Sequence, residues 1–127
     1  MGWYRAQEFG FDPRRCRGIH VGGCVAGRRW PRQSDWDVDA HAHNTDHDPW
    51  FGWICVASER SLFTASRRPT RVMVHEYAHL LAPNSRHGAA WQEAITALGY
   101  PSEAEWHRPR PLRRPVRLRR PVRRRAA

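Results

Sequence analysis

The sequence predicts an α+β fold in which a small, mostly antiparallel sheet packs on two helices. Three observations lead to this prediction. Residues 36–43 alternate strictly between apolar and polar side chains, and residues 50–57 form the most apolar stretch of the chain. Residues 71–82 and 87–98 instead place their apolar side chains three and four positions apart. Alternation is typical of half-buried strands, and the wider spacing is typical of amphipathic helices.

The strands are expected in the first half of the chain. Residues 18–26 combine β-branched side chains with flanking glycines, as strands bounded by turns do. In residues 36–43, alternate side chains lie on opposite faces, so we expect the apolar set to contact the core. We expect residues 50–57 to be the edge strand that borders a cleft beside the first helix. Residues 1–13 could form a short helix or a strand.

The helices have clear boundaries. The first follows Pro69-Thr70 and cannot extend far beyond Pro83, because proline lacks the backbone donor that a helix needs. The second ends where Gly99 is placed as a C-cap. Five apolar side chains on these helices are predicted to be core residues: Met73, Leu80, Leu81, Trp91 and Ile95.

Charge divides the chain into two regions. Residues 1–107 carry twelve arginines and twelve acidic residues, whereas residues 108–127 carry ten arginines and no acid. We predict one folded domain over 1–107 and a disordered, Arg/Pro-rich basic tail over 108–127, since the tail has almost nothing to bury. Such a tail could attract nucleic acid through its phosphates, or could simply be a solubilising extension.

Cysteine usage and hydropathy indicate the compartment. Three cysteines, an odd number, do not form a disulfide framework, and no charged-then-apolar leader opens the chain. No apolar run approaches the roughly 20 residues that a membrane-spanning helix requires. We therefore expect a cytoplasmic protein with no membrane partner, and a monomer.

The first helix contains an HExxH motif, His75-Glu76-Tyr77-Ala78-His79. Residues four apart project from the same helix face, so His75 and His79 can bind one ion. Imidazole nitrogens suit Zn²⁺, which lowers the pKa of a coordinated water to about 7. Glu76 is placed to accept the proton of that water as a general base.

A third ligand is expected from the start of the second helix. His87 follows a Pro-Asn-Ser turn and could fold back toward the motif. Catalytic zinc sites usually have three protein ligands and one open position. We take His87 as the third ligand; if it has no metal role, a carboxylate would replace it, the candidates being Glu93, Glu103 and Glu105.

With His87-Gly88 and Trp91, the motif resembles that of the SprT-like zinc metallopeptidases, small gluzincin-like domains with HExxH, a short loop, and then His-Gly followed by an aromatic residue. The resemblance covers residues 50–99. It implies a strand before the motif helix, Zn²⁺ bound by three histidines, and a protein or peptide substrate. The best-known members act on proteins attached to DNA, which an Arg-rich tail would fit.

Two further groups of side chains could bind metal. His41, His43 and His47 lie among four aspartates, Asp37, Asp39, Asp46 and Asp48. A hydrated strand face and turn is the favoured interpretation of this polar group. Cys16, His20 and Cys24 are spaced four apart, but the glycines between them argue against a helix, so ordinary buried or free thiols are expected.

The sequence thus predicts a zinc-dependent peptidase in which Glu76 activates the attacking water. Two alternatives stay open. One is a nucleic-acid-binding protein in which zinc is structural and the Arg-rich tail makes the contacts. The other is a zinc hydrolase that cleaves a bond other than a peptide bond, because the motif alone does not name the substrate.

Overall fold

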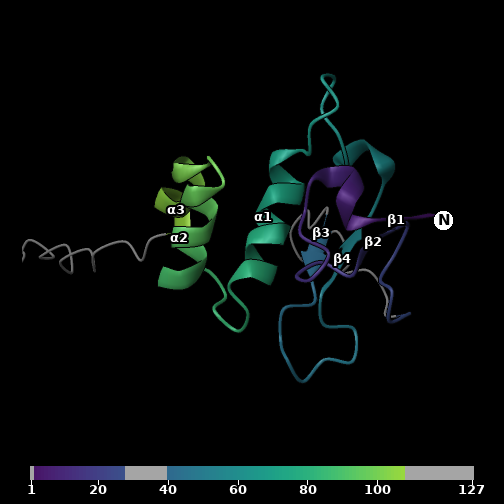
Figure 1. Ribbon diagram of the computed structural model, residues 1–127, viewed down its shortest axis with the longest axis horizontal. Helices are drawn as coiled ribbons and strands as arrows, with labels where there is room; N and C mark the ends of the chain where they lie inside the picture. The colour runs from purple at the N-terminus through teal and green to yellow at the C-terminus, as the bar shows by residue number, and fades with distance from the viewer. Residues whose placement is uncertain (1, 28–39, 108–127) are drawn as a thin grey trace, which may run out of the picture.

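The computed structural model describes residues 2–27 and 40–107 (Figure 1). It is an α+β fold with a small mixed sheet and three α-helices. The predictions for residues 36–39 and for the tail over 108–127 fall outside the described residues. None of the described helices is both long and apolar enough to cross a membrane.

Within residues 2–27 and 40–107, the sheet has four short strands, β1 (Gly2–Tyr4), β2 (Gly18–Val21), β3 (Ala40–Ala42) and β4 (Trp53–Val56). Their order is β1-β2-β4-β3. β1 and β3 pair antiparallel with their neighbours, whereas β2 and β4 pair in parallel. A strand is present in each of the predicted ranges 18–26, 36–43 and 50–57. Among the described residues, each strand is shorter than the range that the sequence pattern predicted.

The prediction that residues 50–57 form an edge strand was wrong. β4 pairs on both sides, with β2 and with β3. Ile54, Cys55 and Val56 are all fully buried, and an apolar run without alternation is typical of a strand that is covered on both faces. Among the described strands, β1 and β3 are the edges. Of these two edge strands, β3 contacts the first helix.

The helices agree closely with their predicted bounds. α1 spans Arg71–Leu81, and the hydroxyl of Thr70 caps it by accepting a hydrogen bond from the Met73 amide. α2 spans Ala89–Ala97. Gly99 follows its C-cap in the left-handed region, with a φ of 98°, as glycine commonly does there. A third helix, α3 (Pro101–His107), was not predicted. The described residues also form two short 3-10 helices, η1 (Ala6–Phe9) and η3 (Glu59–Ser61).

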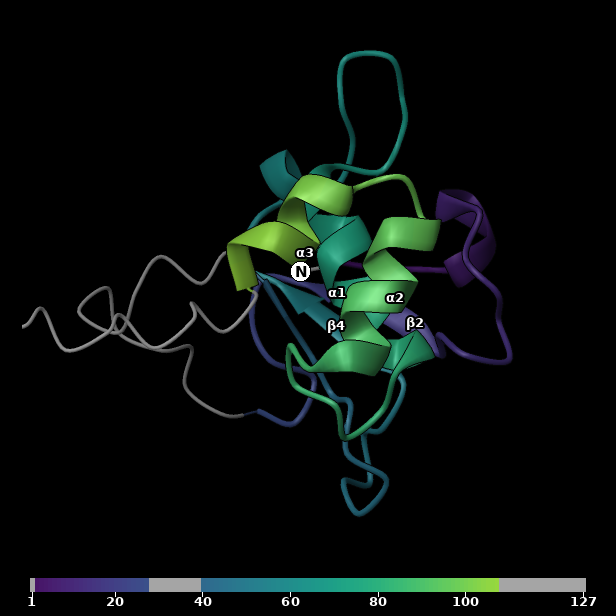
Figure 2. The ribbon, with the colours of Figure 1, turned by 90° about the vertical axis from the view of Figure 1, so that its left-hand side faces the viewer.

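α1 lies between the sheet and the pair formed by α2 and α3 (Figures 1 and 2). One side of α1 belongs to a buried cluster that also contains strand residues; its members from α1 are Met73, Tyr77 and Leu80. Another side belongs to a second cluster with α2; its members from α1 are Val74 and Ala78. His75 and His79 lie one turn apart on a third side of α1, next to the side that carries Val74 and Ala78, and their rings contact Trp91 of α2.

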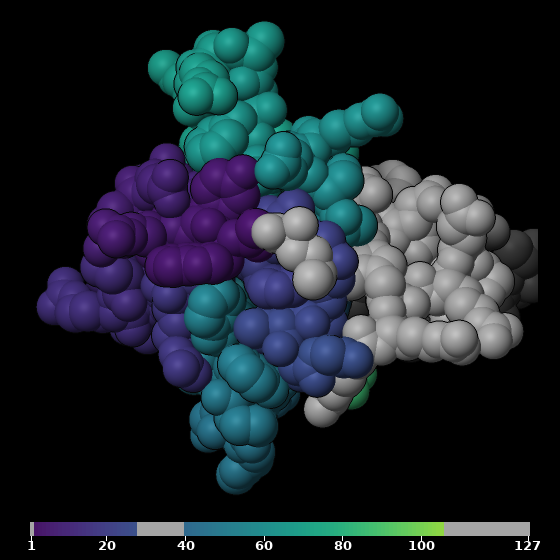
Figure 3. Space-filling model, turned by 90° about the vertical axis from the view of Figure 1, so that its right-hand side faces the viewer, coloured from purple at the N-terminus to yellow at the C-terminus, as the bar shows by residue number. Residues whose placement is uncertain are grey.

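The predicted core is largely confirmed. Met73, Leu80, Trp91 and Ile95 are at most 1 % exposed, whereas Leu81 is only partly buried. On the sheet side of the molecule, the N-terminal segment forms much of the surface (Figure 3). The segment between β3 and β4 and the segment between β4 and α1 project at opposite ends of that side.

Candidate metal centre

The three predicted histidines come together at one point. Nε2 of His87 lies 3.1 Å from Nε2 of His75 and 3.2 Å from Nε2 of His79. Two imidazole nitrogens bound tetrahedrally to zinc at about 2.05 Å are separated by about 3.3 Å. The three side chains thus offer three nitrogens at a spacing that one metal ion fits.

The turn between α1 and α2 brings His87 back to α1. Asn84 and Arg86 adopt positive φ angles of 61° and 48°, which reverse the chain direction over a few residues. The amide of Gly88 donates to the carbonyl of Ser85 at 2.8 Å. The side-chain amide of Gln92 donates to the carbonyl of His87 at 2.9 Å. The position of His87 is therefore fixed from both sides by hydrogen bonds to the backbone.

The indole ring of Trp91 packs against the imidazole rings of all three histidines. Its side chain is fully buried, and its ring centroid lies 4.8, 5.5 and 4.7 Å from the rings of His75, His79 and His87 respectively. Its indole N–H donates to the carbonyl of His75 at 3.3 Å. One rigid side chain thus contacts all three imidazoles and limits their rotation.

Asn44 supports His79 from the segment after β3. Its side-chain amide nitrogen lies 3.3 Å from Nδ1 of His79. Rotating the amide presents its oxygen to the ring instead, because its two ends have nearly the same shape. In that orientation the oxygen accepts from Nδ1–H of His79, which leaves the lone pair on Nε2 for a metal ion. The backbone carbonyl of Asn44 also accepts from the amide of Asn84 at 2.9 Å.

Glu76 is buried beside the histidines. Its side chain is on α1 with 8 % of the residue exposed, and its Oε1 lies 4.0 Å from Nε2 of His75. Burial raises the pKa of Glu76 to about 8, because the charged form loses its hydration. A cation held by the neighbouring histidines would act in the opposite direction and favour the carboxylate.

This burial predicts a pH dependence of stability for the chain stripped of metal by a chelator. The folded chain holds a proton on Glu76 that the unfolded chain releases near its ordinary pKa of 4.5. The contribution of Glu76 to the free energy of unfolding should therefore fall as pH rises from about 4.5 to about 8. Urea unfolding across this range measures it. Glu76→Gln cannot ionise and should show a shallower fall; equal slopes would contradict a buried, ionisable Glu76.

The carboxylates considered as replacements for His87 lie elsewhere. Glu103, on α3, pairs with Arg71 at 3.0 Å. Within the described ranges, neither it nor Glu93 nor Glu105 belongs to the group of ligands formed by the three histidines.

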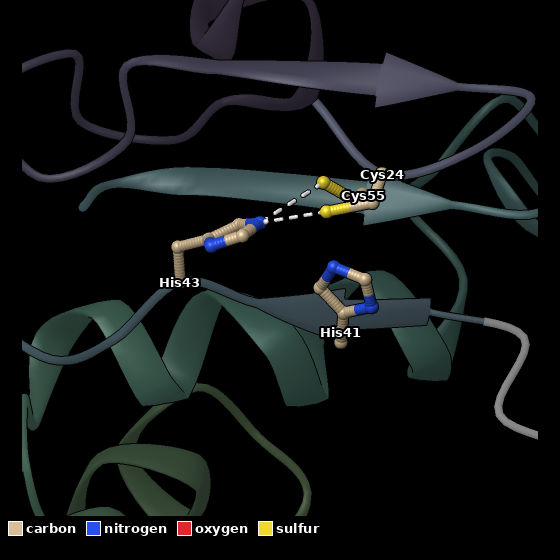
Figure 4. A group of neighbouring side chains, drawn as sticks. All are labelled: Cys24, His41, His43 and Cys55. Atoms are coloured by element: carbon tan, nitrogen blue, oxygen red, sulfur yellow. Dashed lines mark hydrogen bonds between the residues drawn. The ribbon is translucent and has the colours of Figure 1, made fainter. Parts of the chain in front are cut away.

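A second group of ligands combines two histidines, whose metal binding was the less favoured interpretation, with two cysteines that the sequence did not connect to them. The expectation of a hydrated polar face was wrong for His43, which is 6 % exposed, whereas His41 is half-buried. Both histidines gather with Cys24 and Cys55 (Figure 4). His41 pairs with Cys55 across β3 and β4, so their side chains share a sheet face. Their ligand atoms all lie within 4.8 Å of one another, and the group could hold a metal ion.

Three other residues of these two sequence patterns, Cys16, His20 and His47, are not members of that group. Cys16 is a buried free thiol whose sulfur lies 3.7 Å from the carbonyl of Gly18, as the sequence led us to expect. Nδ1 of His20 lies 2.7 Å from the carbonyl of Gly23. His47 is exposed and near Asp46. The one sequence signal for the second group was the His-x-His pair, since nothing in the linear order joins it to Cys24 or Cys55.

Comparisons with known proteins do not identify the chain. No protein-family model, curated protein or solved structure matches it. The side chains of the candidate metal centre are therefore the basis of the function proposed below.

Proposed function

We propose that this chain is a zinc-dependent metallopeptidase of the SprT-like type. The observation that carries the proposal is the convergence of three Nε2 atoms, from His75, His79 and His87, beside the buried carboxyl group of Glu76. Three neutral nitrogen ligands with a neighbouring carboxylate are the donor set of a catalytic zinc site with an open position. A structural site would be expected to have four protein ligands instead.

The residues fit zinc in kind and in spacing. Imidazole is a common zinc ligand, and the N···N distances of 3.1 and 3.2 Å agree with a tetrahedral arrangement. A bound zinc would supply Lewis acidity, polarising the substrate carbonyl and acidifying a water. The three histidines hold the ion, while Trp91 and Asn44 keep the imidazoles in place.

Glu76 has the role of proton carrier. Its carboxylate takes a proton from the attacking water and later gives it to the leaving amine, so that hydrolysis begins and ends with the same ionisation state. Its Oε1 lies 4.0 Å from Nε2 of His75. One water molecule is therefore enough to bridge the carboxylate and the metal centre. Burial also keeps bulk water from competing for the proton.

We expect an extended peptide substrate to pair with the edge strand β3. Within the described part of the sheet, β3 is an edge and contacts α1, so an extended peptide added beyond it would run close to the histidines. Main-chain hydrogen bonds would then hold the peptide with little preference for its side chains. We accordingly propose an unfolded or extended protein segment as the substrate, in a cytoplasmic setting.

Cleavage of an unfolded protein tests the function. The full chain, loaded with one or more equivalents of Zn²⁺, is incubated with a reduced, carboxymethylated protein, and the new amino termini are quantified. We expect cleavage that stops with a chelator and returns when Zn²⁺ is added back. A folded, zinc-loaded chain that produces no new amino termini from unfolded proteins would contradict the peptidase proposal.

A further inference from the structure

The group of Cys24, His41, His43 and Cys55 lies on the sheet face opposite α1. Ile54 and Val56 of β4 belong to the cluster that contains α1 residues. Cys55, between them, must point to the other face because side chains alternate along a strand. This group is therefore separated from the three-histidine centre by the sheet, and the proposed peptidase chemistry makes no use of it.

The spacing within the group is that of metal ligands. Nε2 of His43 lies 3.4 Å from the sulfur of Cys24 and 3.4 Å from the sulfur of Cys55 (Figure 4). For tetrahedral zinc, bond lengths of about 2.3 Å to sulfur and 2.05 Å to nitrogen place these atoms about 3.5 Å apart. The ring of His41 lies beside that of His43, with centroids 5.0 Å apart, so a fourth donor completes the set.

The surroundings orient the ligands as outer groups do at metal sites. Nδ1 of His43 is 2.6 Å from a carboxylate oxygen of Asp48. This contact holds a proton on Nδ1 and leaves the lone pair of Nε2 facing the two sulfurs. The backbone amide of Val25 donates to the sulfur of Cys55 at 3.3 Å. Such a donor stabilises a thiolate more than a neutral thiol, because the acceptor is then charged.

We infer that Cys24, His41, His43 and Cys55 bind a second zinc ion whose role is structural. Two sulfurs and two imidazoles form a tetrahedral donor set that favours zinc. Four protein ligands leave no open position for a substrate.

The ion would join three separate segments: the turn after β2, which carries Cys24, the strand β3 with the residue that follows it, and β4. Strands of three or four residues have few ladder hydrogen bonds of their own, so a metal would supply part of their stability. Asn44 directly follows His43 and contacts His79, so the second ion would also fix a support of the first centre.

Cobalt substitution of the full chain tests this site by a signal that needs sulfur. Co²⁺ bound by thiolates gives ligand-to-metal charge-transfer absorption, which imidazole ligands alone do not give. We expect this absorption in the wild type, its marked reduction in Cys55→Ser, which leaves only the sulfur of Cys24, and its full retention in Cys16→Ser. Cys16 is the matched control because it too is a buried, free cysteine. His79→Ala should also retain it, which separates this test from the peptidase proposal.

Further readouts keep the test decisive if Cys55→Ser does not fold. His41→Ala removes a half-buried ligand and should weaken the charge-transfer absorption and the affinity for Co²⁺. The metal-loaded wild type, denatured without reductant, should have three free thiols. Absence of thiolate absorption in the folded wild type would overturn the inference. So would a single free thiol, which would mean that Cys24 and Cys55 form a disulfide in place of a metal site.

Discussion

Glu76→Gln should abolish proteolysis while leaving the metal in place. The amide has nearly the shape of the carboxyl group but cannot accept the proton of the attacking water. Loss of a general base lowers turnover by about 10²–10⁴-fold. Glu76 is not one of the three converging nitrogens, so the zinc content should stay at the wild-type value. Cleavage rates of an unfolded protein and elemental analysis of the same preparation measure both effects.

The control for this prediction is Glu93→Gln. Glu93 lies on α2 and is outside the ligand group of the described residues. The Glu93→Gln substitution removes a carboxylate from the chain without changing a residue of the metal centre. The cleavage rate of this variant should therefore match that of the wild type. A Glu76→Gln protein that cleaves as fast as Glu93→Gln would show that another group accepts the proton.

Trp91→Ala should both destabilise the fold and weaken zinc binding. Trp91 is fully buried in the cluster between α1 and α2 and contacts all three imidazoles. Replacing a buried tryptophan by alanine typically costs about 3–5 kcal/mol of stability. The three imidazoles would also lose the ring against which they all pack, so we expect a lower zinc affinity. Chemical unfolding and competition with a chromogenic chelator measure the two losses.

Trp91→Phe separates packing from the hydrogen bond. Phenylalanine keeps an aromatic ring in contact with the imidazoles but lacks the indole N–H that donates to the carbonyl of His75. We expect a loss of stability well below that of Trp91→Ala, and zinc affinity close to the wild type. If Trp91→Ala kept wild-type affinity for zinc while remaining folded, the positioning role of this side chain would be wrong.

The helices and the three-histidine group could be predicted because their information is local. The spacing of His75 and His79 on one helix puts both side chains on one face by geometry alone. His87 needed only a short turn, which Pro83 and the residues after it made plausible. α3 was missed because its seven residues carry too short a pattern to distinguish a helix from a loop.

The sheet order and the second ligand group could not be predicted because they depend on pairing across the chain. The apolar run of β4 indicates burial, but the run does not say which strands flank it. His41 and His43 look like the polar face of an amphipathic strand. Only the register of β3 against β4, together with the turn that follows β2, brings the two cysteines to that face.

The number of zinc ions per folded chain in His79→Ala, compared with the wild type, tests the three-histidine centre most directly. His47→Ala serves as the control, because this side chain is 97 % exposed and lies in the turn after β3. We predict that His79→Ala binds one zinc ion fewer than the wild type, and that His47→Ala binds the wild-type number. Equal zinc content in folded His79→Ala and wild type would contradict the centre and the peptidase mechanism built on it.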